Sequence, residues 1–294
     1  MTVAPRLGQA ADLTPVKIAG TYSESASNVL YALEGGFFKQ NGIDVALQAF
    51  SGSGAYANGI LSGSFDVGSI STGSIVLAHD RNVPFVVIAN GGVYSHTAPN
   101  TYLCVLKGSP IRTATDFKGK TIAVSTLGDI TQVAVMGWLD RNGCDYHAVN
   151  FIEMTPSLMV PALQQKRIDG AFLGEPSLTT SFGVVTQLAS PYDTVAPHFA
   201  IVDWVTSKSW AAANPDIVKR LQTAFARADS WAMANRVQAG AILAKYAKLT
   251  PELVEHMHHV DWVPGASATL MQPVVDAMAR YGFIAKRFSA DELL

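Results

Sequence analysis

The chain has 294 residues, of which 49% are apolar and 15% are charged, so it can bury large cores and exceeds the usual length of one domain. Its 21 basic and 23 acidic residues nearly balance, which argues against a nucleic-acid or membrane-surface partner, because both need a basic stripe. No apolar run approaches the ~20 residues of a membrane span, and we expect two lobes of roughly 100–150 residues each.

The beginning of the chain and its cysteines say little about the compartment. Residues 1–13 lack the apolar core of a signal peptide, so the chain is either cytoplasmic or the mature form of an exported protein. Two cysteines, Cys104 and Cys144, are too few to indicate a redox environment, and we expect two buried free thiols.

Short apolar strands alternate with helical stretches along most of the chain, which predicts mostly parallel sheets flanked by helices. Ser, Thr and Asp after the strands mark helix starts, because their side chains accept bonds from the free N–H groups of a first turn. Beyond residue 214 the pattern is wholly helical, over residues 216–235, 252–259 and 267–281. The expected strands are residues 16–21, 44–50, 65–70, 85–89, 102–106, 121–125, 150–154, 170–173 and 199–205.

A weak internal repeat links residues 58–70 with residues 161–173. The two segments align without gaps and place Asp66 opposite Asp169. Each segment predicts a helix end, a tight turn through the aspartate and a buried strand. Two interpretations stay open: any α/β protein can produce such a pair, or the two lobes share one topology.

The motifs of common enzymes and nucleotide-binding proteins are incomplete in this sequence. Residues 52–57 fit the dinucleotide pattern G-x-G-x-x-G/A, but the next strand ends without the acidic residue that would hold a ribose, so its glycines better suit close approach of another ligand. The sequence has no nucleophile elbow, no P-loop and no C-x-x-C. His256, His258 and His259 cluster without the rest of a zinc-protease motif, which favours a solvated helix end over a metal site.

Four segments resemble one known family in their order and spacing. They read VLYALEGGFFKQNG (29–42), ILSGSFDVGS (60–69), DFKGKTIAV (116–124) and DGAFLGEP (169–176). They are similar to segments of the nitrate/sulfonate/taurine-type solute-binding proteins of ABC transporters, together with the thiamine pyrimidine-precursor binders. The likeness covers about residues 14–235.

The resemblance implies an α/β, two-lobed type II periplasmic-binding-protein fold, in which each lobe is a mixed sheet flanked by helices and two strands form the hinge. Residues 14–98 with 199–294 would form lobe 1, and residues 99–198 lobe 2. The implied function is solute binding without chemistry, cofactor or metal, by a periplasmic or lipid-anchored monomer that serves an ABC permease and its ATPase. An enzyme on the same fold (pyrimidine synthase or menaquinone-pathway type), with His96 as the one base near the site, or a ligand-sensing domain are the alternatives.

Ligands of open α/β sheets bind beyond the carboxyl ends of the strands. The loops that follow the expected strands are rich in Ser, Thr, Gly and Tyr and hold no Lys or Arg. We expect ligand contacts from Tyr22, Ser23, Glu24, Ser25, Ser53, Gly54, Tyr56, Ser71, Thr72, Tyr94, His96, Ser125, Thr126, Asp129, Thr155 and Glu175.

The acids among these residues predict the polarity of the ligand. Helix N-termini at the site favour an anion by up to about 1 kcal/mol each. A carboxylate about 4 Å from a second negative charge costs on the order of 4 kcal/mol at an effective dielectric of 20, which outweighs several helix ends. Asp129 has the alternative role of capping its own helix and Glu175 that of ordering its own loop. We therefore expect a neutral or amine-bearing ligand, with an aromatic ring stacked on tyrosine as one option.

Overall fold

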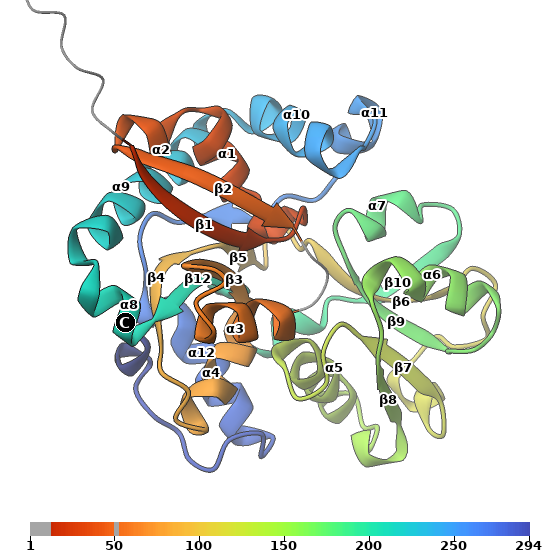
Figure 1. The fold of residues 1–294 in the computed structure, drawn as a ribbon. Helices are drawn as coiled ribbons and strands as arrows, with labels where there is room; N and C mark the ends of the chain where they lie inside the picture. Colours follow the sequence, from red (N-terminus) through yellow and green to blue (C-terminus); the bar gives the residue numbers. More distant parts are fainter. Residues whose placement is uncertain (1–12, 50–52) are drawn as a thin grey trace, which may run out of the picture.

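The computed structural model describes residues 13–49 and 53–294 and is built on two five-stranded sheets (Figure 1). The first has the order β2-β1-β3-β12-β4, and comprises β1 (Thr14–Gly20), β2 (Ile43–Ala49), β3 (Val67–Ser71), β4 (Phe85–Asn90) and β12 (Val202–Ser207). The second has the order β10-β6-β9-β7-β8, and comprises β6 (Thr101–Leu106), β7 (Thr121–Val124), β8 (Asn150–Glu153), β9 (Gly170–Gly174) and β10 (Val185–Ala189). A small third sheet joins β5 (Gly92–Ser95) to β11 (His198–Ala200) and β13 (Asp261–Trp262).

The two large sheets lie in two bodies side by side, which we call lobe 1 and lobe 2 (Figure 1). Lobe 1 takes its strands from both ends of the chain, and lobe 2 takes its strands from the middle. The chain passes between them through β5 and β6 on the way out, and through the turn η4 (Pro191–Thr194) and β11 on the way back. The predicted fold class is confirmed, and the limits of the two lobes stay a prediction.

Both large sheets have the same topology. β1 pairs in parallel with β2 and β3, and β7 pairs in parallel with β8 and β9. β12 is antiparallel to both of its neighbours, β3 and β4, and β6 is antiparallel to both of its neighbours, β9 and β10. Each sheet is therefore mixed, with a single reversed strand among strands that otherwise run the same way, in line with the expectation of mostly parallel sheets and with the mixed sheets that the resemblance implies. Because β3 and β9 occupy equivalent places, the repeat of residues 58–70 in residues 161–173 reflects a shared topology.

The aspartates of this repeat act identically in the two lobes. The Asp66 carboxylate accepts the Lys17 N–H at 2.7 Å, and the Asp66 N–H donates back to the Lys17 carbonyl. The Asp169 carboxylate accepts the Thr121 N–H at 2.9 Å, and the Asp169 N–H donates back to the Thr121 carbonyl. Each aspartate thus bridges the start of its strand to the neighbouring strand and defines where pairing begins.

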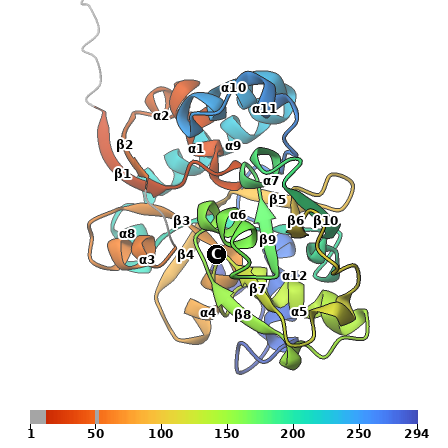
Figure 2. The same cartoon turned by 90° about the vertical axis from the view of Figure 1, so that its right-hand side faces the viewer.

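Helices cover both faces of the sheet in lobe 1 (Figures 1 and 2). On one side α1, α2 and α9 pack together, and on the other α12 packs against α4. Helix α5 of lobe 2 also packs against α4 and α12, so the two lobes meet along these helices. The helices are α1 (Asn28–Glu34), α2 (Phe37–Gln40), α3 (Ser53–Leu61), α4 (Thr72–Asp80), α5 (Ile130–Arg141), α6 (Pro156–Gln164), α7 (Ser177–Thr180), α8 (Lys208–Ala213), α9 (Pro215–Ala234), α10 (Arg236–Ala247), α11 (Pro251–Glu255) and α12 (Ala268–Arg280).

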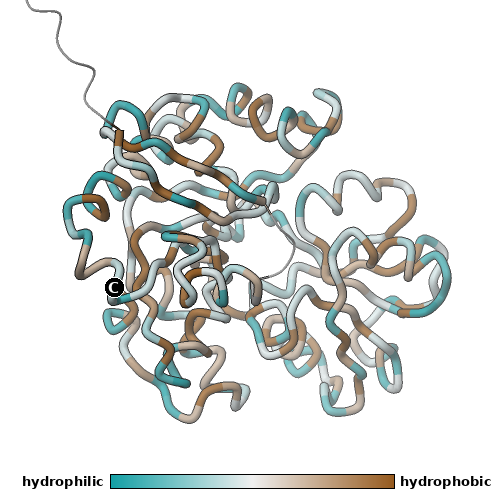
Figure 3. The backbone as a smooth tube through the Cα atoms, in the orientation of Figure 1, coloured by the Kyte–Doolittle hydropathy of each residue, from teal (hydrophilic) through white to brown (hydrophobic). Residues whose placement is uncertain are grey.

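One large apolar cluster fills lobe 1 and continues through α5 into lobe 2, where a second, smaller cluster packs around Met159 and Leu163. At the centre of lobe 1 the ring of Trp204 stacks on Phe225 with centroids 5.0 Å apart. Helix α9 reaches this core through one apolar stripe with helical spacing. In Figure 3 the strands and the inner sides of the helices are correspondingly apolar, and hydrophilic stretches lie on the periphery.

Most predicted elements are present, with a few instructive differences. Eight of the nine expected strands match a single strand, and the ninth, residues 199–205, is divided at Ile201 into β11 and β12. The helix predicted over residues 252–259 is wrong beyond Glu255, where α11 ends. Cys104 and Cys144 are free and buried, as expected. Within the described ranges, no helix is long and apolar enough to cross a membrane.

Candidate functional site

The two lobes contact each other at two places beside the carboxyl ends of their strands. The first contact involves Glu24, after β1, and Glu175, after β9. The second joins Ser71, at the end of β3, to Asp129, which precedes α5. These four residues come from the loops in which the sequence predicts ligand contacts.

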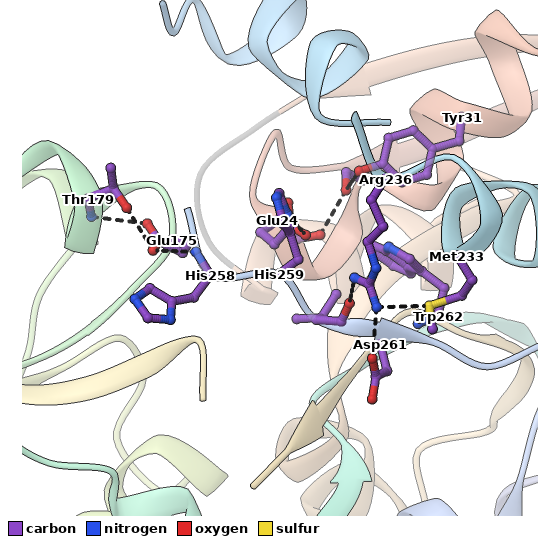
Figure 4. Close-up of polar contacts among 12 residues, drawn as sticks. Glu24, Tyr31, Glu175, Thr179, Met233, Arg236, His258, His259, Asp261 and Trp262 are labelled. Atoms are coloured by element: carbon purple, nitrogen blue, oxygen red, sulfur yellow. Dashed lines mark hydrogen bonds and ion pairs between the residues drawn. The ribbon is translucent and has the colours of Figure 1, made fainter. Parts of the chain in front are cut away.

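Residues 256–259, which we call the histidine segment, link the acids of the first contact (Figure 4). His259 Nδ1 is hydrogen-bonded to Glu24 Oε1 at 3.0 Å. The neighbouring His258 N–H donates to Glu175 Oε1 at 3.1 Å. Since the histidine segment leads into β13, which pairs with β5, it connects the C-terminal part of the chain to an acid in each lobe.

Glu24 is the most unusual group of this contact. Its side chain is 2% exposed, and its second oxygen, Oε2, is buried with no hydrogen-bond partner among the described residues. A buried acceptor without a donor costs about 1–3 kcal/mol. The hydrogen bond from His259 to Glu24 raises the pKa of His259, which favours the charged imidazolium beside the acid. Glu24 Oε2 is therefore a buried acceptor that lacks a donor among the described residues.

Glu175 is satisfied by protein donors instead. Besides the His258 N–H, its carboxylate accepts the Thr179 N–H at 3.0 Å and the Thr179 hydroxyl at 2.8 Å. Burial raises the pKa of Glu175, against the lowering effect of these donors. Glu175 thus orders the start of α7 and holds the histidine segment, which is the loop-ordering alternative given by the sequence.

The histidine segment also corrects the charge count made from the sequence. The expectation of a solvated helix end is confirmed for His256, the exposed C-cap of α11. It is wrong for His258 and His259, which follow the helix and are half-buried, with 26% of the His259 side chain exposed. Arg236 supports the segment by donating to the Val260 carbonyl at 2.7 Å and to Asp261 at 2.9 Å. The strand-end loops carry no Lys or Arg, but the folded chain places His259 and Arg236 behind them. In the sequence, the only signal of positive charge at this contact was the cluster of three histidines.

The second contact is centred on Asp129, which is 2% exposed. One carboxylate oxygen accepts hydrogen bonds from the Ser71 hydroxyl and, at 2.9 Å, from the Ser74 hydroxyl, both in lobe 1. The other oxygen accepts the N–H of Ile130 at the start of α5. A Cβ on Gly73 would collide with this carboxylate, so the close approach of α4 requires glycine. Burial raises the pKa of Asp129.

Several other predicted residues lie at the strand ends near these contacts. The exposed ring of Tyr22 packs against Tyr246 with centroids 5.5 Å apart. The hydroxyls of Ser23 and Ser25 are 3.4 Å apart in the turn that holds Glu24. Ser125, Thr126 and Thr155 lie at the carboxyl ends of β7 and β8: the Ser125 hydroxyl bonds that of Thr131, the Thr126 carbonyl accepts from Thr131, and Thr155 is exposed before α6.

The structure does not bring four of the predicted residues to either contact. Tyr56 is buried in lobe 1 and donates to the Gly20 carbonyl at 2.9 Å, and the Thr72 hydroxyl donates to buried Asp203 at 2.7 Å. Tyr94 and His96 lie where the chain crosses between the lobes. Both bond Asp193, at 2.5 Å from the Tyr94 hydroxyl and 2.7 Å from His96 Nδ1.

Two further predicted residues, Ser53 and Gly54, begin α3. They follow residues 50–52, which lie outside the described part of the chain, and their side chains are likewise not described. Their contact with a ligand stays a prediction.

Comparison with known proteins connects this arrangement to solute-binding proteins. The NMT1/THI5 like family model matches residues 24–239. A candidate binding protein of Brucella abortus (strain 2308) is 27% identical over 247 residues, 81% of this chain and 73% of the relative. The taurine-binding periplasmic protein of Escherichia coli (strain K12) is 25% identical over 208 residues, 69% of this chain and 62% of the relative. A candidate ABC transporter periplasmic binding protein of Brachyspira hyodysenteriae is 26% identical over 175 residues, 56% of this chain and 50% of the relative.

Solved structures share the fold over nearly the whole chain. The alkanesulfonate-binding protein SsuA of Xanthomonas axonopodis pv. citri bound to MOPS has a TM-score of 0.80 at 18% identity, covering 97% of this chain and 99% of that one. The periplasmic nitrate-binding protein NrtA of Synechocystis PCC 6803 has a TM-score of 0.78 at 17% identity, covering 97% and 86%. The desulfurization enzyme DSZB has a TM-score of 0.69 at 15% identity, covering 95% and 96%. At these identities the likeness concerns the fold alone.

Proposed function

The chain belongs to the NMT1/THI5-like family, and from this premise we propose that it is the substrate-binding protein of an ABC importer. Outside the cytoplasm, it binds a small organic molecule between lobe 1 and lobe 2 and delivers the molecule, unaltered, to a membrane permease. The observation that carries this proposal is the family match over residues 24–239, which spans strands of both lobes, together with relatives named as periplasmic binding proteins.

The contacts between the lobes suggest how binding is coupled to closure. A ligand shifts a two-state equilibrium only through interactions that differ between the states. Glu24 in lobe 1 and the loop after β9 in lobe 2 lie on either side of the histidine segment, so a molecule held there contacts both lobes only when they are closed (Figure 4). The permease then distinguishes the closed form from the open one.

We further propose that the ligand is neutral or carries an amine, and that one of its donors binds Glu24 Oε2. This oxygen is a buried acceptor that the described residues leave without a donor. The relatives are named for taurine, alkanesulfonate and nitrate, but two buried acids, Glu24 and Glu175, flank the histidine segment. A third, Asp129, lies at the other contact between the lobes. His259 is already paired with Glu24 and Arg236 with Asp261, so neither cation offers an incoming anion an unpaired positive charge.

A thermal-shift screen tests both parts of the proposal. Amines and pyrimidines are expected to raise the melting temperature of the wild-type protein, and Glu24→Gln is expected to remove most of this rise. Glu252→Gln, a change at an exposed acid of α11, is the matched control and should leave the rise intact. Stabilisation by nitrate and alkylsulfonates alone would refute the ligand class, and no stabilisation by any solute would refute the binding function.

The desulfurization enzyme DSZB shares the fold, so an enzyme is the alternative function for this chain. Here burial raises the pKa of the Cys104 thiol to about 12 and also raises that of Cys144, so neither supplies a thiolate nucleophile at neutral pH. His96 is exposed, and its Nδ1 is bonded to Asp193 at the crossing between the lobes. These observations favour binding without chemistry.

A further inference from the structure

The N-termini of two helices from different lobes converge on one buried carboxylate. Helix α4 of lobe 1 has nine residues and begins directly after Ser71, and helix α5 of lobe 2 has twelve and begins directly after Asp129. The Asp129 carboxylate lies between them, bonded to the hydroxyls of Ser71 and Ser74 on one side and to the Ile130 N–H on the other.

This junction has the properties of an anion site. Helix N-termini carry a partial positive charge that favours anions. The donors at this junction are the hydroxyls of Ser71 and Ser74 and the Ile130 N–H. The N–H groups of Thr72 and Ser74 in α4 donate instead to the Ile201 carbonyl and to Ser71 Oγ. Both helices exceed two turns, and they approach so closely that Gly73 has no room for a side chain beside the carboxylate. The negative group at this junction is the carboxylate of Asp129, a residue of the protein itself.

A role as a helix cap alone does not account for these contacts. Capping of α5 uses only one oxygen of Asp129, the acceptor of the Ile130 N–H. The other oxygen is bonded to two hydroxyls of the opposite lobe, 55 and 58 residues away in sequence. The Asp129 carboxylate therefore accepts hydrogen bonds from lobe 1 as well as from its own helix.

We propose that Asp129 is a built-in anion, which occupies the junction of α4 and α5 when the lobes close and thereby excludes anionic solutes from it. Asp129 is then the residue that sets the selectivity of this chain against sulfonates, nitrate and similar anions. The inference rests on the proposed function, because it concerns which solutes the site between the lobes accepts.

Removal of the carboxylate should convert the junction into an anion site. The experiment is isothermal titration of the wild type, Asp129→Ser and Asp129→Asn with methanesulfonate, nitrate and sulfate near neutral pH. The wild type should show no binding up to about 10 mM, and Asp129→Ser should bind at least one of these anions at least about tenfold more tightly than that limit. Asp145→Ser is the matched control, because Asp145 also caps a turn in lobe 2, by accepting the His147 N–H at 2.9 Å, and should gain no affinity.

Two results overturn the proposal: wild-type protein that binds these anions with a Kd below about 10 mM, or folded Asp129 variants that gain no affinity. Circular dichroism establishes folding, and Asp129→Asn, which keeps an acceptor for Ile130, decides if Asp129→Ser does not fold. If neither variant folds, the proposal is judged by whether the wild-type protein binds these anions within the Kd limit given above. Failure of the proposed function looks different, since the wild type would then bind no solute of any class, whatever the variants do.

Discussion

The hydrogen bond between His259 and Glu24 predicts a stability difference that depends on pH. In His259→Gln the side chain can still donate to Glu24 but cannot carry a charge. The acid is 2% exposed and the histidine side chain 26% exposed, so solvent screens the pair only partly. The variant keeps a hydrogen bond to the Glu24 carboxylate and loses only the attraction between the two charges. That attraction lies between the ~0–1 kcal/mol of an exposed ion pair and the ~3–5 kcal/mol of a buried one. We therefore expect the substitution to cost about 1–2 kcal/mol when the histidine is charged.

The sign of the pH dependence follows from the raised pKa of His259. Glu24 is the main cause, Glu175 acts in the same direction, and burial and Arg236 oppose them. A group whose pKa is higher in the folded state binds its proton more tightly there, so its contribution is complete below its unfolded pKa of about 6.5. The contribution is lost as the pH rises through the raised folded pKa. Wild type and His259→Gln should thus differ most near pH 6 and least near pH 9.

Thermal unfolding followed by circular dichroism measures this difference. For chains of 150–250 residues, 1 kcal/mol shifts the melting temperature by about 2–4 °C, so the deficit near pH 6 should be about 2–8 °C. His96→Gln is the control, because the His96 side chain is 63% exposed and pairs with a partly exposed Asp193, and it should show no such trend. An equal deficit at every pH, or an equal trend in the control, would refute the reasoning.

Three further predictions concern the repeat, the thiols and the second lobe. Asp66→Ala and Asp169→Ala should each lower the free energy of unfolding by about 1–2 kcal/mol in urea, because each frees a strand N–H; a loss in only one would contradict their equivalence. Cys104 and Cys144 should react with a thiol reagent near pH 8 only after unfolding, and fast labelling of the native protein would contradict their burial. Glu175→Ala should release the histidine segment and enlarge the radius of gyration in small-angle scattering, whereas unchanged dimensions would argue against Glu175 as a link between the lobes.

The sequence was most informative where local pattern determines the structure. β3 and β9 are buried apolar runs preceded by an aspartate turn, so both strands and their shared topology follow from composition and spacing. β5 and β13 have only four and two residues, and their pairing depends on where the lobes meet, which no local pattern encodes.

The candidate site shows the same division. The rule that ligands bind at strand ends led to Glu24, Asp129 and Glu175, which all lie at contacts with other parts of the chain. Their partners were not predictable: His259 is 235 residues from Glu24, and His258 is 83 residues from Glu175. The same rule wrongly included Tyr56, whose ring is buried in the core. Position near a strand end does not reveal whether a ring points toward the core or toward the site.

The most direct test of the account is the identity and fate of the molecule that the protein binds. Mass spectrometry of the small molecules released from purified protein on unfolding, followed by titration of the unliganded protein with the identified compound, gives both. We predict one neutral or amine-bearing organic molecule per chain, recovered unchanged after incubation with the protein. A chemically altered product would contradict a binding protein, and a simple inorganic anion or alkylsulfonate would contradict the role given to Glu24 and Asp129.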